Sequence, residues 1–237
     1  MNRPYVICHM LSSLDGKIDG SFMSAPETVP TRTEYGRLRT TFQCQATMYG
    51  TTTMEEAYAE GRAPALEPCT AGYSREDYVA QSDVDNYIVS VDPEGVLGWA
   101  SKYIEKKGRP RAHVIEVLTR QASDKYLAYL RGFDISYIFA GEQELDCALA
   151  LRKLKELFHI DRLILAGGAV MNASLLQEGL IDELSILVAP VVDGGDGATL
   201  FRRGNILPVH PPMAFTLKDI KQLEGNGLWL RYLKQEE

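Results

Sequence analysis

The chain has 237 residues, of which 45% are hydrophobic and 24% charged, so it can bury a sizeable core as one domain or two small ones. Its net charge of −7 and its dispersed basic residues argue against an extended basic surface, and we expect no nucleic-acid partner. Cys8, Cys44, Cys69 and Cys147 form no Cys-x-x-Cys pair, which predicts neither a metal site nor a disulfide framework. With no signal-peptide pattern and no apolar run near the roughly 20 residues of a membrane span, the chain is expected to be cytoplasmic, without a membrane partner.

Short runs typical of strands alternate with helical patterns along the chain. In chain order, the expected elements are a strand at 5–11, a helix at 33–42, a strand at 46–49, a helix at 53–59, a strand at 87–91, a helix at 99–106, a strand at 112–118, a helix at 125–131, a strand at 135–139, a helix at 144–158, a strand at 162–165, a helix at 172–177, and strands at 184–191, 213–223 and 227–233. Residues 60–83, with scattered Gly, Pro and Ser, are expected to form a long surface excursion.

This order of elements predicts the fold class. Alternating strands and helices are typical of a mostly parallel central sheet with flanking helices, and the last three strands follow one another with little helix between them. They are therefore expected to complete the sheet as antiparallel strands. No repeat, low-complexity tract or Pro-rich linker divides the chain, which favours a single α/β domain over residues 1–237.

The strongest functional signal is the pair Gly167-Gly168, which follows an apolar strand and precedes a helical pattern. Without β-carbons, these residues let a pyrophosphate approach the backbone, and the free N–H groups and positive dipole end of the next helix face its charge. The pair therefore predicts a dinucleotide site. A tight turn between a strand and a helix is the alternative, and the pair alone does not decide between them.

A second signal follows the first strand, where Asp15-Gly16 predicts a turn that exposes one carboxylate and the ammonium of Lys17. The carboxyl ends of the strands are the usual ligand side of an open α/β sheet. The alternative is an ordinary hairpin or loop turn. His9 alternates with core positions of the same strand, and we interpret it as a buried histidine with satisfied hydrogen bonds.

Two more strand ends carry residues suited to phosphate. Gly50 and Thr53 lie between a strand and a helix, where backbone N–H groups and hydroxyls can donate to phosphate oxygens, although a simple threonine N-cap is the alternative. Thr119 and Arg120 offer a hydroxyl and a guanidinium that would suit the 2′-phosphate of NADPH. A solvated arginine is the alternative at that position.

In this order, the strand ends resemble those of the dihydrofolate reductase-like fold, in which three of them hold NADPH. The residues that match its Gly-x-x-Thr, Leu-Thr and Gly-Gly steps are Gly50, Thr53, Leu118, Thr119, Arg120, Gly167, Gly168, Ala169 and Val170. The resemblance implies an NADPH site at these positions.

The closer resemblance is to the riboflavin-biosynthesis reductase domain, which forms the C-terminal half of the bacterial bifunctional deaminase-reductase and also occurs alone. The matching motifs are Ser-Leu-Asp-Gly-Lys at 13–17, Gly-Leu-Ile-Asp-Glu-Leu at 179–184, Pro-x-x-x-Gly at 190–194 and Leu-Phe at 200–201. They span roughly residues 3–233 and are specific as an ordered set. No zinc-deaminase signature of His-x-Glu with Pro-Cys-x-x-Cys is present in this sequence, so we expect no deaminase half in it.

This resemblance implies that NADPH reduces the ring-opened imine form of a ribosylamino-pyrimidine 5′-phosphate to its ribityl form. The protein must then align cofactor and substrate, exclude water and donate a proton to the imine nitrogen. Asp15 and Lys17 are the candidates for proton handling or substrate binding, and Ser13 is expected to bind the substrate beside them. Arg37 and Arg39 are candidates for the substrate phosphate, with an exposed helix face as the alternative.

Two departures from the family pattern leave the substrate open. The family commonly has a glutamate just before the Gly-Gly pair, on the substrate side, where this chain has Ala166. It also often has an aspartate four residues after the threonine of Gly-x-x-Thr, where this chain has Ala57. The alternatives are an NADPH reductase of another pterin-like or carbonyl substrate and a catalytically silent nucleotide-binding protein. The family commonly forms dimers, and the apolar C-terminal strands would suit a homodimer.

Overall fold

The computed structural model describes residues 2–66, 72–203 and 210–235, so Cys69 lies outside the described residues. The described residues group into two compact units. The first contains the residues up to Pro4 and Gln45–Asp161, and the second contains Tyr5–Cys44 and the residues from Arg162 onward. The single domain expected from the sequence stays a prediction.

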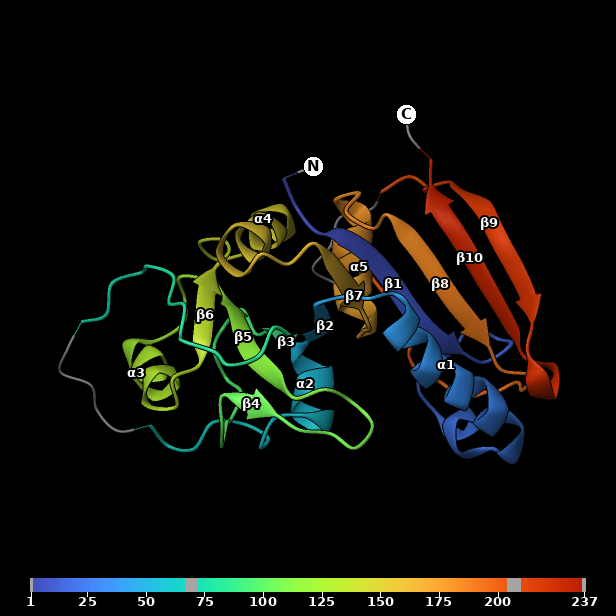
Figure 1. Cartoon of the computed structure of the whole chain (residues 1–237), viewed down its shortest axis with the longest axis horizontal. Coiled ribbons are helices and arrows are strands. Elements are labelled where there is room, and N and C mark those ends of the chain that lie inside the picture. The colour runs from blue at the N-terminus through green and yellow to red at the C-terminus, as the bar shows by residue number, and fades with distance from the viewer. Residues whose placement is uncertain (1, 67–71, 204–209, 236–237) are drawn as a thin grey trace. The chain divides into compact units, whose positions relative to one another are not determined.

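The first unit is built on four parallel strands in the order β2, β3, β5 and β6, with β4 antiparallel to the start of β5 (Figure 1). Its elements are β2 (Ala46–Gly50), α2 (Thr51–Ala57), β3 (Tyr87–Val91), β4 (Tyr103–Ile104), β5 (Ala112–Leu118), α3 (Asp124–Gly132), β6 (Ser136–Phe139) and α4 (Cys147–Phe158). Every residue of β5 and β6 is buried, as expected for parallel strands covered on both faces.

Local sequence signals set the helix bounds in this unit. Helix α4 begins because the carboxylate of Asp146 accepts a hydrogen bond from the amide of Leu149 at 2.7 Å. It ends where His159 takes a left-handed conformation, with φ of 55°. Between these caps, Ala150, Leu151, Leu154 and Phe158 recur at helical spacing and are all buried.

The second unit is built on five strands in the order β7, β1, β8, β10 and β9. β7, β1 and β8 are parallel, while β10 is antiparallel to both β8 and β9. Its strands and helices are β1 (Tyr5–Ser12), α1 (Val29–Thr41), β7 (Arg162–Leu165), α5 (Ala169–Gln177), β8 (Glu183–Val188), β9 (Phe215–Gln222) and β10 (Leu228–Lys234), with short 3₁₀ turns at Ser21–Ser24, Pro26–Thr28 and Glu224–Asn226. The antiparallel C-terminal strands predicted from the sequence are confirmed.

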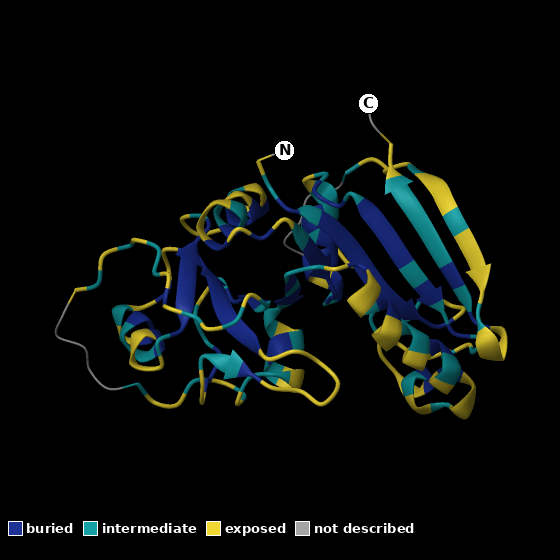
Figure 2. Cartoon of the chain, in the orientation of Figure 1, coloured by how far each residue is buried: buried dark blue, intermediate teal, exposed yellow. Residues whose placement is uncertain are grey.

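A buried ion cluster fixes the outer strands of this unit. Glu183, at the start of β8, is only 1% exposed, and one of its carboxylate oxygens accepts from Arg231 Nε at 2.6 Å. The other oxygen accepts from Lys218 Nζ at 3.2 Å, so the carboxylate is paired from both β10 and β9. Figure 2 shows β1 as buried along nearly its whole length and β9 as largely exposed.

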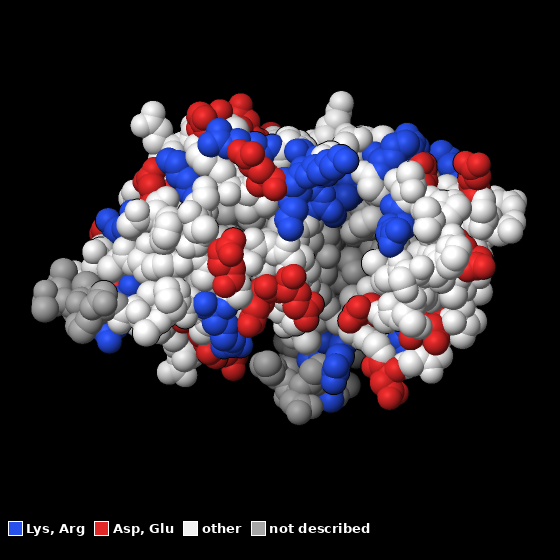
Figure 3. All heavy atoms as spheres, turned by 90° about the horizontal axis from the view of Figure 1, so that it is seen from below, with Lys and Arg blue, Asp and Glu red and all other residues white. Residues whose placement is uncertain are grey.

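The surface carries charged side chains of both signs. Acidic and basic side chains are interspersed on the face that Figure 3 shows. Within the described ranges, no helix has the length and apolar character needed to cross a bilayer. Over the same residues, no group of three or more His, Cys, Asp or Glu side chains is placed to hold a metal ion.

One predicted helix is wrong. Residues 99–106 contain no helix, because Tyr103 and Ile104 form strand β4 and pair with His113 and Ala112 of β5. The ring of Tyr103 packs edge to face on that of His113, with 5.6 Å between the ring centroids, so the pairing with β5 decides the structure of this segment. The strands expected at 87–91, 112–118 and 162–165 coincide with β3, β5 and β7.

Candidate functional site

In the second unit, the predicted residues gather where parallel strands end. β1 pairs with β7 up to Cys8 and Leu165, and with β8 up to Ser12 and Val188. The carboxyl ends of these three strands therefore lie at one edge of the sheet, which is the usual ligand side of an α/β fold. The turn at 13–17 follows β1, and the turn at 166–168 follows β7.

The turn after β7 has the geometry that its glycines predict. Ala166 is 9% exposed, and Gly167 has φ of 102°, a value that L side chains rarely adopt. The Gly167–Gly168 peptide bond is cis. A β-carbon added at Gly167 would lie 3.6 Å from Met10 Cε, which places this glycine beside β1.

Helix α5 begins directly after this turn with Gly168 as its N-cap, and no side chain caps its first turn. The backbone N–H groups in the first turn of α5 therefore donate to no side chain of the N-cap residue, and they lie at the positive end of the helix dipole. Val170, in the first turn, is 40% exposed. Uncapped donors next to residues without β-carbons are a donor set that fits a phosphate or pyrophosphate group.

The loop after β8 packs back on α5. The amide of Arg202 donates to the carbonyl oxygen of Ala169 at 3.0 Å, and Asn172 Nδ2 donates to the carbonyl oxygen of Leu200 at 2.8 Å. Asn172 is fully buried. The Leu-Phe motif at 200–201 is thus tied to the first two turns of α5, and nothing in the sequence singled out Asn172 for this role.

The carboxylate of Asp15 is occupied by its neighbours. One oxygen accepts from Ser13 Oγ at 2.6 Å and from the amide of Asp193 at 2.9 Å, and the other accepts from the amide of Gly194 at 3.1 Å. The Ser13 hydroxyl and these two amides hold the pKa of the Asp15 carboxyl well below its usual range. Asp15 is therefore ionised at neutral pH and anchors the loop after β8, and the geometry does not support it as a proton donor.

Lys17 keeps its expected place beside this loop. Its Nζ donates to the carbonyl oxygen of Gly197 at 3.2 Å, and its backbone forms a bridge with Thr199. An ammonium has three N–H donors, so one contact leaves capacity for a ligand. The role of Lys17 in proton handling stays a prediction.

Asp193, in the loop after β8, is a second anchoring aspartate, and no sequence motif pointed to it. Asp193 Oδ2 accepts from the amide of Phe22 at 2.9 Å and from Ser21 Oγ at 3.1 Å, and Oδ1 accepts from the amide of Gly195 at 3.1 Å. The Phe22 amide contributes most to keeping the pKa of Asp193 below its ordinary value. Asp15 and Asp193 together connect the loop after β8 to two segments that follow β1.

His9 is a structural residue, as the sequence predicted. Its Nε2 lies 3.0 Å from the carbonyl oxygen of Tyr35, which can only accept, so Nε2 carries the proton. Its Nδ1 then accepts from Ser185 Oγ at 3.0 Å, and that hydroxyl accepts from Trp229 Nε1 at 2.8 Å. Burial lowers the pKa of His9 to about 4, so the ring is neutral at physiological pH.

Arg37 and Arg39 of α1 have partners within the helix. Arg37 donates through Nε to Glu34 at 2.7 Å and forms a second contact through Nη2, as an exposed i,i+3 pair. Arg39 lies over the ring of Tyr35, with 5.9 Å from its guanidinium carbon to the ring centroid. A substrate phosphate would have to compete with Glu34 for Arg37, and both arginines stay predictions.

In the first unit, the predicted residues also lie at the carboxyl ends of parallel strands. β2 ends at Gly50, which is the N-cap of α2 and leaves it without a side-chain cap. Thr51 Oγ1 donates to the carbonyl oxygen of Val91, at the end of the neighbouring β3, at 2.8 Å. Thr53 lies in the first turn of α2 and is half-buried.

Thr119 and Arg120 follow β5, on the other side of β3. Thr119 is fully buried, and its hydroxyl donates to the carbonyl oxygen of Pro93 at 2.7 Å, so it anchors the strand end instead of facing solvent. Arg120 has a 48% exposed side chain whose Nε lies 3.0 Å from Glu142 Oε1. The expectation that Thr119 donates to a 2′-phosphate is therefore not supported by its burial, whereas Arg120 is accessible.

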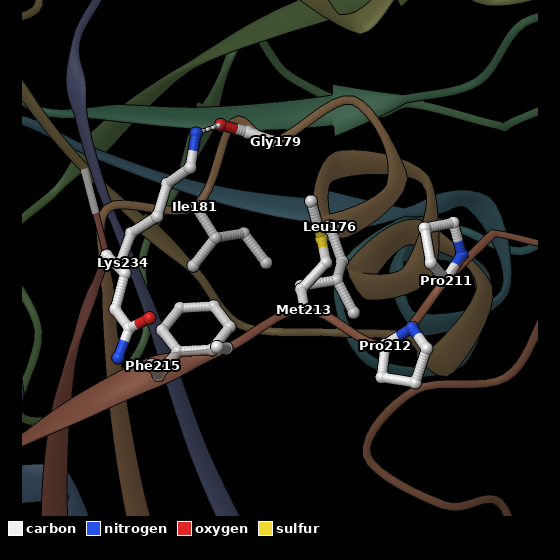
Figure 4. Close-up of a pocket in the computed structure, with 10 residues that line it drawn as sticks. Leu176, Gly179, Ile181, Pro211, Pro212, Met213, Phe215 and Lys234 are labelled. Carbon is white, nitrogen blue, oxygen red and sulfur yellow. Dashed lines mark hydrogen bonds between the residues drawn. The ribbon is translucent and has the colours of Figure 1, made fainter. Parts of the chain in front are cut away.

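A separate pocket of about 320 Å³ lies in the second unit. It is lined by Leu176, Gly179, Ile181, Pro211, Pro212, Met213, Ala214, Phe215, Lys234 and Gln235. Figure 4 shows mainly apolar side chains and the contact of Lys234 Nζ with the carbonyl oxygen of Gly179, at 2.8 Å. Leu176 is at the far end of α5 from Gly168, about 12 Å along the helix, so this pocket is distinct from the glycine turn.

Comparisons with known proteins point to one family. The family described as the RibD C-terminal domain matches residues 4–228. A 2,5-diamino-6-ribosylamino-4(3H)-pyrimidinone 5′-phosphate reductase of Methanothermobacter thermautotrophicus is 27% identical over 209 residues, which cover 84% of this chain and 83% of that protein.

Solved structures share the fold at low sequence identity. A pyrimidine reductase-like protein of Corynebacterium diphtheriae has a TM-score of 0.69 at 16% identity, with 100% of this chain and 94% of that chain covered. The riboflavin biosynthesis reductase Rib7 of Saccharomyces cerevisiae has a TM-score of 0.63 at 18% identity, covering 99% and 91%. RibD of Acinetobacter baumannii has a TM-score of 0.63 at 19% identity, and this chain spans 59% of its length.

Proposed function

Because the chain belongs to the RibD C-terminal domain family, we propose that it is an NADPH-dependent reductase of the riboflavin pathway, acting on a ribosylamino-pyrimidine 5′-phosphate. The observation that carries the proposal is the turn after β7, where Gly167 and Gly168 lead into the uncapped first turn of α5. The 27% identical reductase, matched over 83% of its length, supports the substrate class.

The residues present suit the cofactor. The N–H groups at the start of α5, including those of Ala169 and Val170, would bind its pyrophosphate. Gly50 and Thr53 would bind phosphate oxygens at the start of α2, and Arg120 would recognise the 2′-phosphate. Bound NADPH would supply the hydride for the acceptor carbon.

The chain itself must provide the proton. Reduction of an imine adds a hydride to carbon and a proton to nitrogen, and Lys17 Nζ–H is the proposed donor. Asp15 keeps the loop after β8 in place beside Lys17 through the amides of Asp193 and Gly194. Ser13 and Ala166 are proposed to lie on the substrate side, and Arg37 or Arg39 would bind the substrate phosphate.

One observation favours a second candidate function. The methyl group of Ala166 at the end of β7 offers no acceptor where the family commonly has a carboxylate. An NADPH reductase of a different pterin-like or carbonyl substrate would not need that carboxylate. Measuring NADPH oxidation with a panel of pyrimidine, pterin and carbonyl substrates separates the two functions. A riboflavin-pathway reductase should oxidise NADPH fastest with the ribosylamino-pyrimidine, and a reductase of the second kind should do so with a pterin or carbonyl substrate. Binding of NADPH without turnover of any substrate would indicate a silent nucleotide-binding protein.

Cofactor choice gives the first test at residue level. The Arg120→Ala variant should lose affinity for NADPH by about tenfold and leave NADH affinity unchanged, because only NADPH presents a 2′-phosphate to the guanidinium. Glu142→Gln is the matched control, since it removes the partner of Arg120 but keeps the guanidinium. Equal affinity of the natural protein for NADH and NADPH in fluorescence titrations would contradict this assignment of Arg120.

The proposed enzyme is a cytoplasmic homodimer. Cys8, Cys44 and Cys147 are free thiols, which suits a reducing compartment. Leu217 and Ile220 of β9 are 50% and 54% exposed and face the same side of the sheet as their partners Tyr232 and Leu230 of β10. An exposed apolar sheet face of this kind is typical of an interface between identical subunits.

A further inference from the structure

The turn that follows β3 supports both predicted cofactor-binding strand ends of the first unit. The carbonyl oxygen of Val91 accepts from Thr51 Oγ1 at 2.8 Å, beside the Gly50 end of β2. The carbonyl oxygen of Pro93 accepts from the amide of Thr119 at 2.9 Å and from its hydroxyl at 2.7 Å, beside Arg120. Only Asp92 separates these two carbonyl groups in the chain.

The buried carboxylate of Asp92 determines the shape of this turn. Asp92 is 1% exposed, and its Oδ2 accepts from the amides of Val96 at 2.6 Å and Leu97 at 2.9 Å. Its own amide donates to the carbonyl oxygen of Val117 in β5 at 3.1 Å. Removing the carboxylate would leave the buried amide of Leu97 and the part-buried amide of Val96 without their acceptor, and such a loss is costly enough to change the turn.

Helix α3 closes the turn from another side. Tyr126 OH donates to the carbonyl oxygen of Leu97 at 3.0 Å and lies 3.4 Å from Asp92 Oδ2. Gly95 has φ of 71°, and a β-carbon at that position would collide with the Tyr126 ring. Three residues therefore constrain the turn: Asp92 through its carboxylate, Gly95 because its position has no room for a β-carbon, and the buried Tyr126.

From these contacts we infer that Asp92 is a positioning residue for the cofactor. Its carboxylate holds the turn at residues 92–97. That turn contains the Pro93 carbonyl group that binds Thr119, and it directly follows the Val91 carbonyl group that binds Thr51. The inference rests on the proposed NADPH function. Asp92 is buried and need not contact the cofactor. Its effect passes through the backbone that carries Gly50, Thr53 and Arg120.

The test compares Asp92 with a second aspartate that anchors neighbouring segments. The carboxylate of Asp134 accepts hydrogen bonds from two side chains, Lys102 Nζ and Tyr78 OH, and it lies before the start of β6, away from the carboxyl ends of the strands. Asp92→Ala and Asp134→Ala would be measured side by side for Tm, for NADPH affinity and for amide hydrogen exchange without cofactor. Asp92→Asn, which keeps an acceptor oxygen for both amides, is the conservative variant.

Asp92→Ala should raise the Kd for NADPH at least about tenfold more than Asp134→Ala does at a comparable loss of Tm. The Thr119 amide should exchange faster in the Asp92 variant alone, and kcat at saturating NADPH should change little. Asp92→Asn should restore most of the affinity. If Asp92→Ala does not fold, Asp92→Asn should still raise the Kd about threefold, with no change for Asp134→Asn.

Two results would overturn the inference in distinguishable ways. If the natural protein binds NADPH and the Asp92 variants lose no more affinity than their Asp134 counterparts, Asp92 is only a structural residue and the proposed function stands. If the natural protein itself does not bind NADPH, the proposed function fails and the inference fails with it.

Discussion

Asp15 illustrates how neighbours decide the chemistry of a residue. A carboxylate in a turn after the first strand of an α/β sheet is a reasonable candidate acid, yet here it accepts from Ser13 and from two backbone amides. These donors stabilise its charged form. The same hydrogen bonds that disfavour its protonated form make it the anchor of the loop at 193–195.

At Ala166, the expected gain from a carboxylate can be measured. If this position faces the substrate, Ala166→Glu adds an acceptor for amino and hydroxyl hydrogens of the ribosylamino-pyrimidine. A charge-assisted hydrogen bond contributes about 1.5–3 kcal/mol, so kcat/KM should rise by about one to two orders of magnitude, with NADPH affinity little changed. Ala166→Gln, of similar size but without charge, is the control. If the natural enzyme already turns over the ribosylamino-pyrimidine efficiently and the Glu variant is slower, Ala166 is an ordinary strand-end residue.

At Gly168, cofactor binding and folding can be separated. Gly168→Val places a branched side chain at the N-cap of α5, where the pyrophosphate is proposed to bind. NADPH affinity should therefore fall far more than Tm does. Gly72→Val is the control, because a β-carbon at Gly72 meets nothing within 4 Å. Equal losses of affinity and Tm at Gly168 would support a turn with no role in binding.

Among the elements, β5 is unusual because it carries a carboxyl group in the middle of a buried strand. Glu116 is fully buried, between Ile115 and Val117, and its neighbours include Ser90, Trp99 and Asp92. Burial, and then the charge of Asp92, raise the pKa of Glu116 well above its usual value. The folded state therefore favours its protonated form.

This raised pKa predicts a loss of stability at high pH. The folded protein binds a proton at Glu116 that the unfolded chain releases above its ordinary pKa, so the free energy of unfolding falls by about 1.4 kcal/mol per pH unit until the raised pKa is reached. Glu116→Gln removes this dependence, and its Tm should exceed that of the natural protein increasingly above pH 5 until the raised pKa of Glu116 is reached. The exposed Glu56→Gln is the control. Parallel melting curves across this range would contradict the prediction.

The elements also show what a sequence can predict. The Gly167-Gly168 turn could be found because the φ of 102° at Gly167 favours glycine. Strands β3, β5 and β7 could be found because their apolar runs are bounded by polar residues. The residues 99–106 were misassigned because the pairing of Tyr103 and Ile104 with β5 overrides the local pattern. Asp193 was missed because its partners Ser21 and Phe22 lie more than 170 residues away.

At the scale of the whole molecule, the apolar face of β9 and β10 predicts the oligomeric state. The natural protein should have the mass of two chains in light scattering. Ile220→Lys should shift it to one chain, because a lysine on this face would bury an unpaired charge in the interface. Thr216→Lys, on the opposite face of β9, should leave the mass unchanged. A natural protein with the mass of one chain at micromolar concentration would contradict the homodimer.

The path of the chain through its two units has a consequence for synthesis on the ribosome. The strands of the first unit lie within residues 46–139 and can pair as soon as they emerge, whereas β1 pairs only with β7 and β8, more than 150 residues later. At about 5–20 residues per second, β1 waits roughly 10–35 seconds for its neighbours. During that time Val6, Ile7 and Cys8, which are fully buried in the finished protein, have no sheet to join. The nascent chain therefore presents its first apolar strand to chaperones and to other nascent chains for most of its translation.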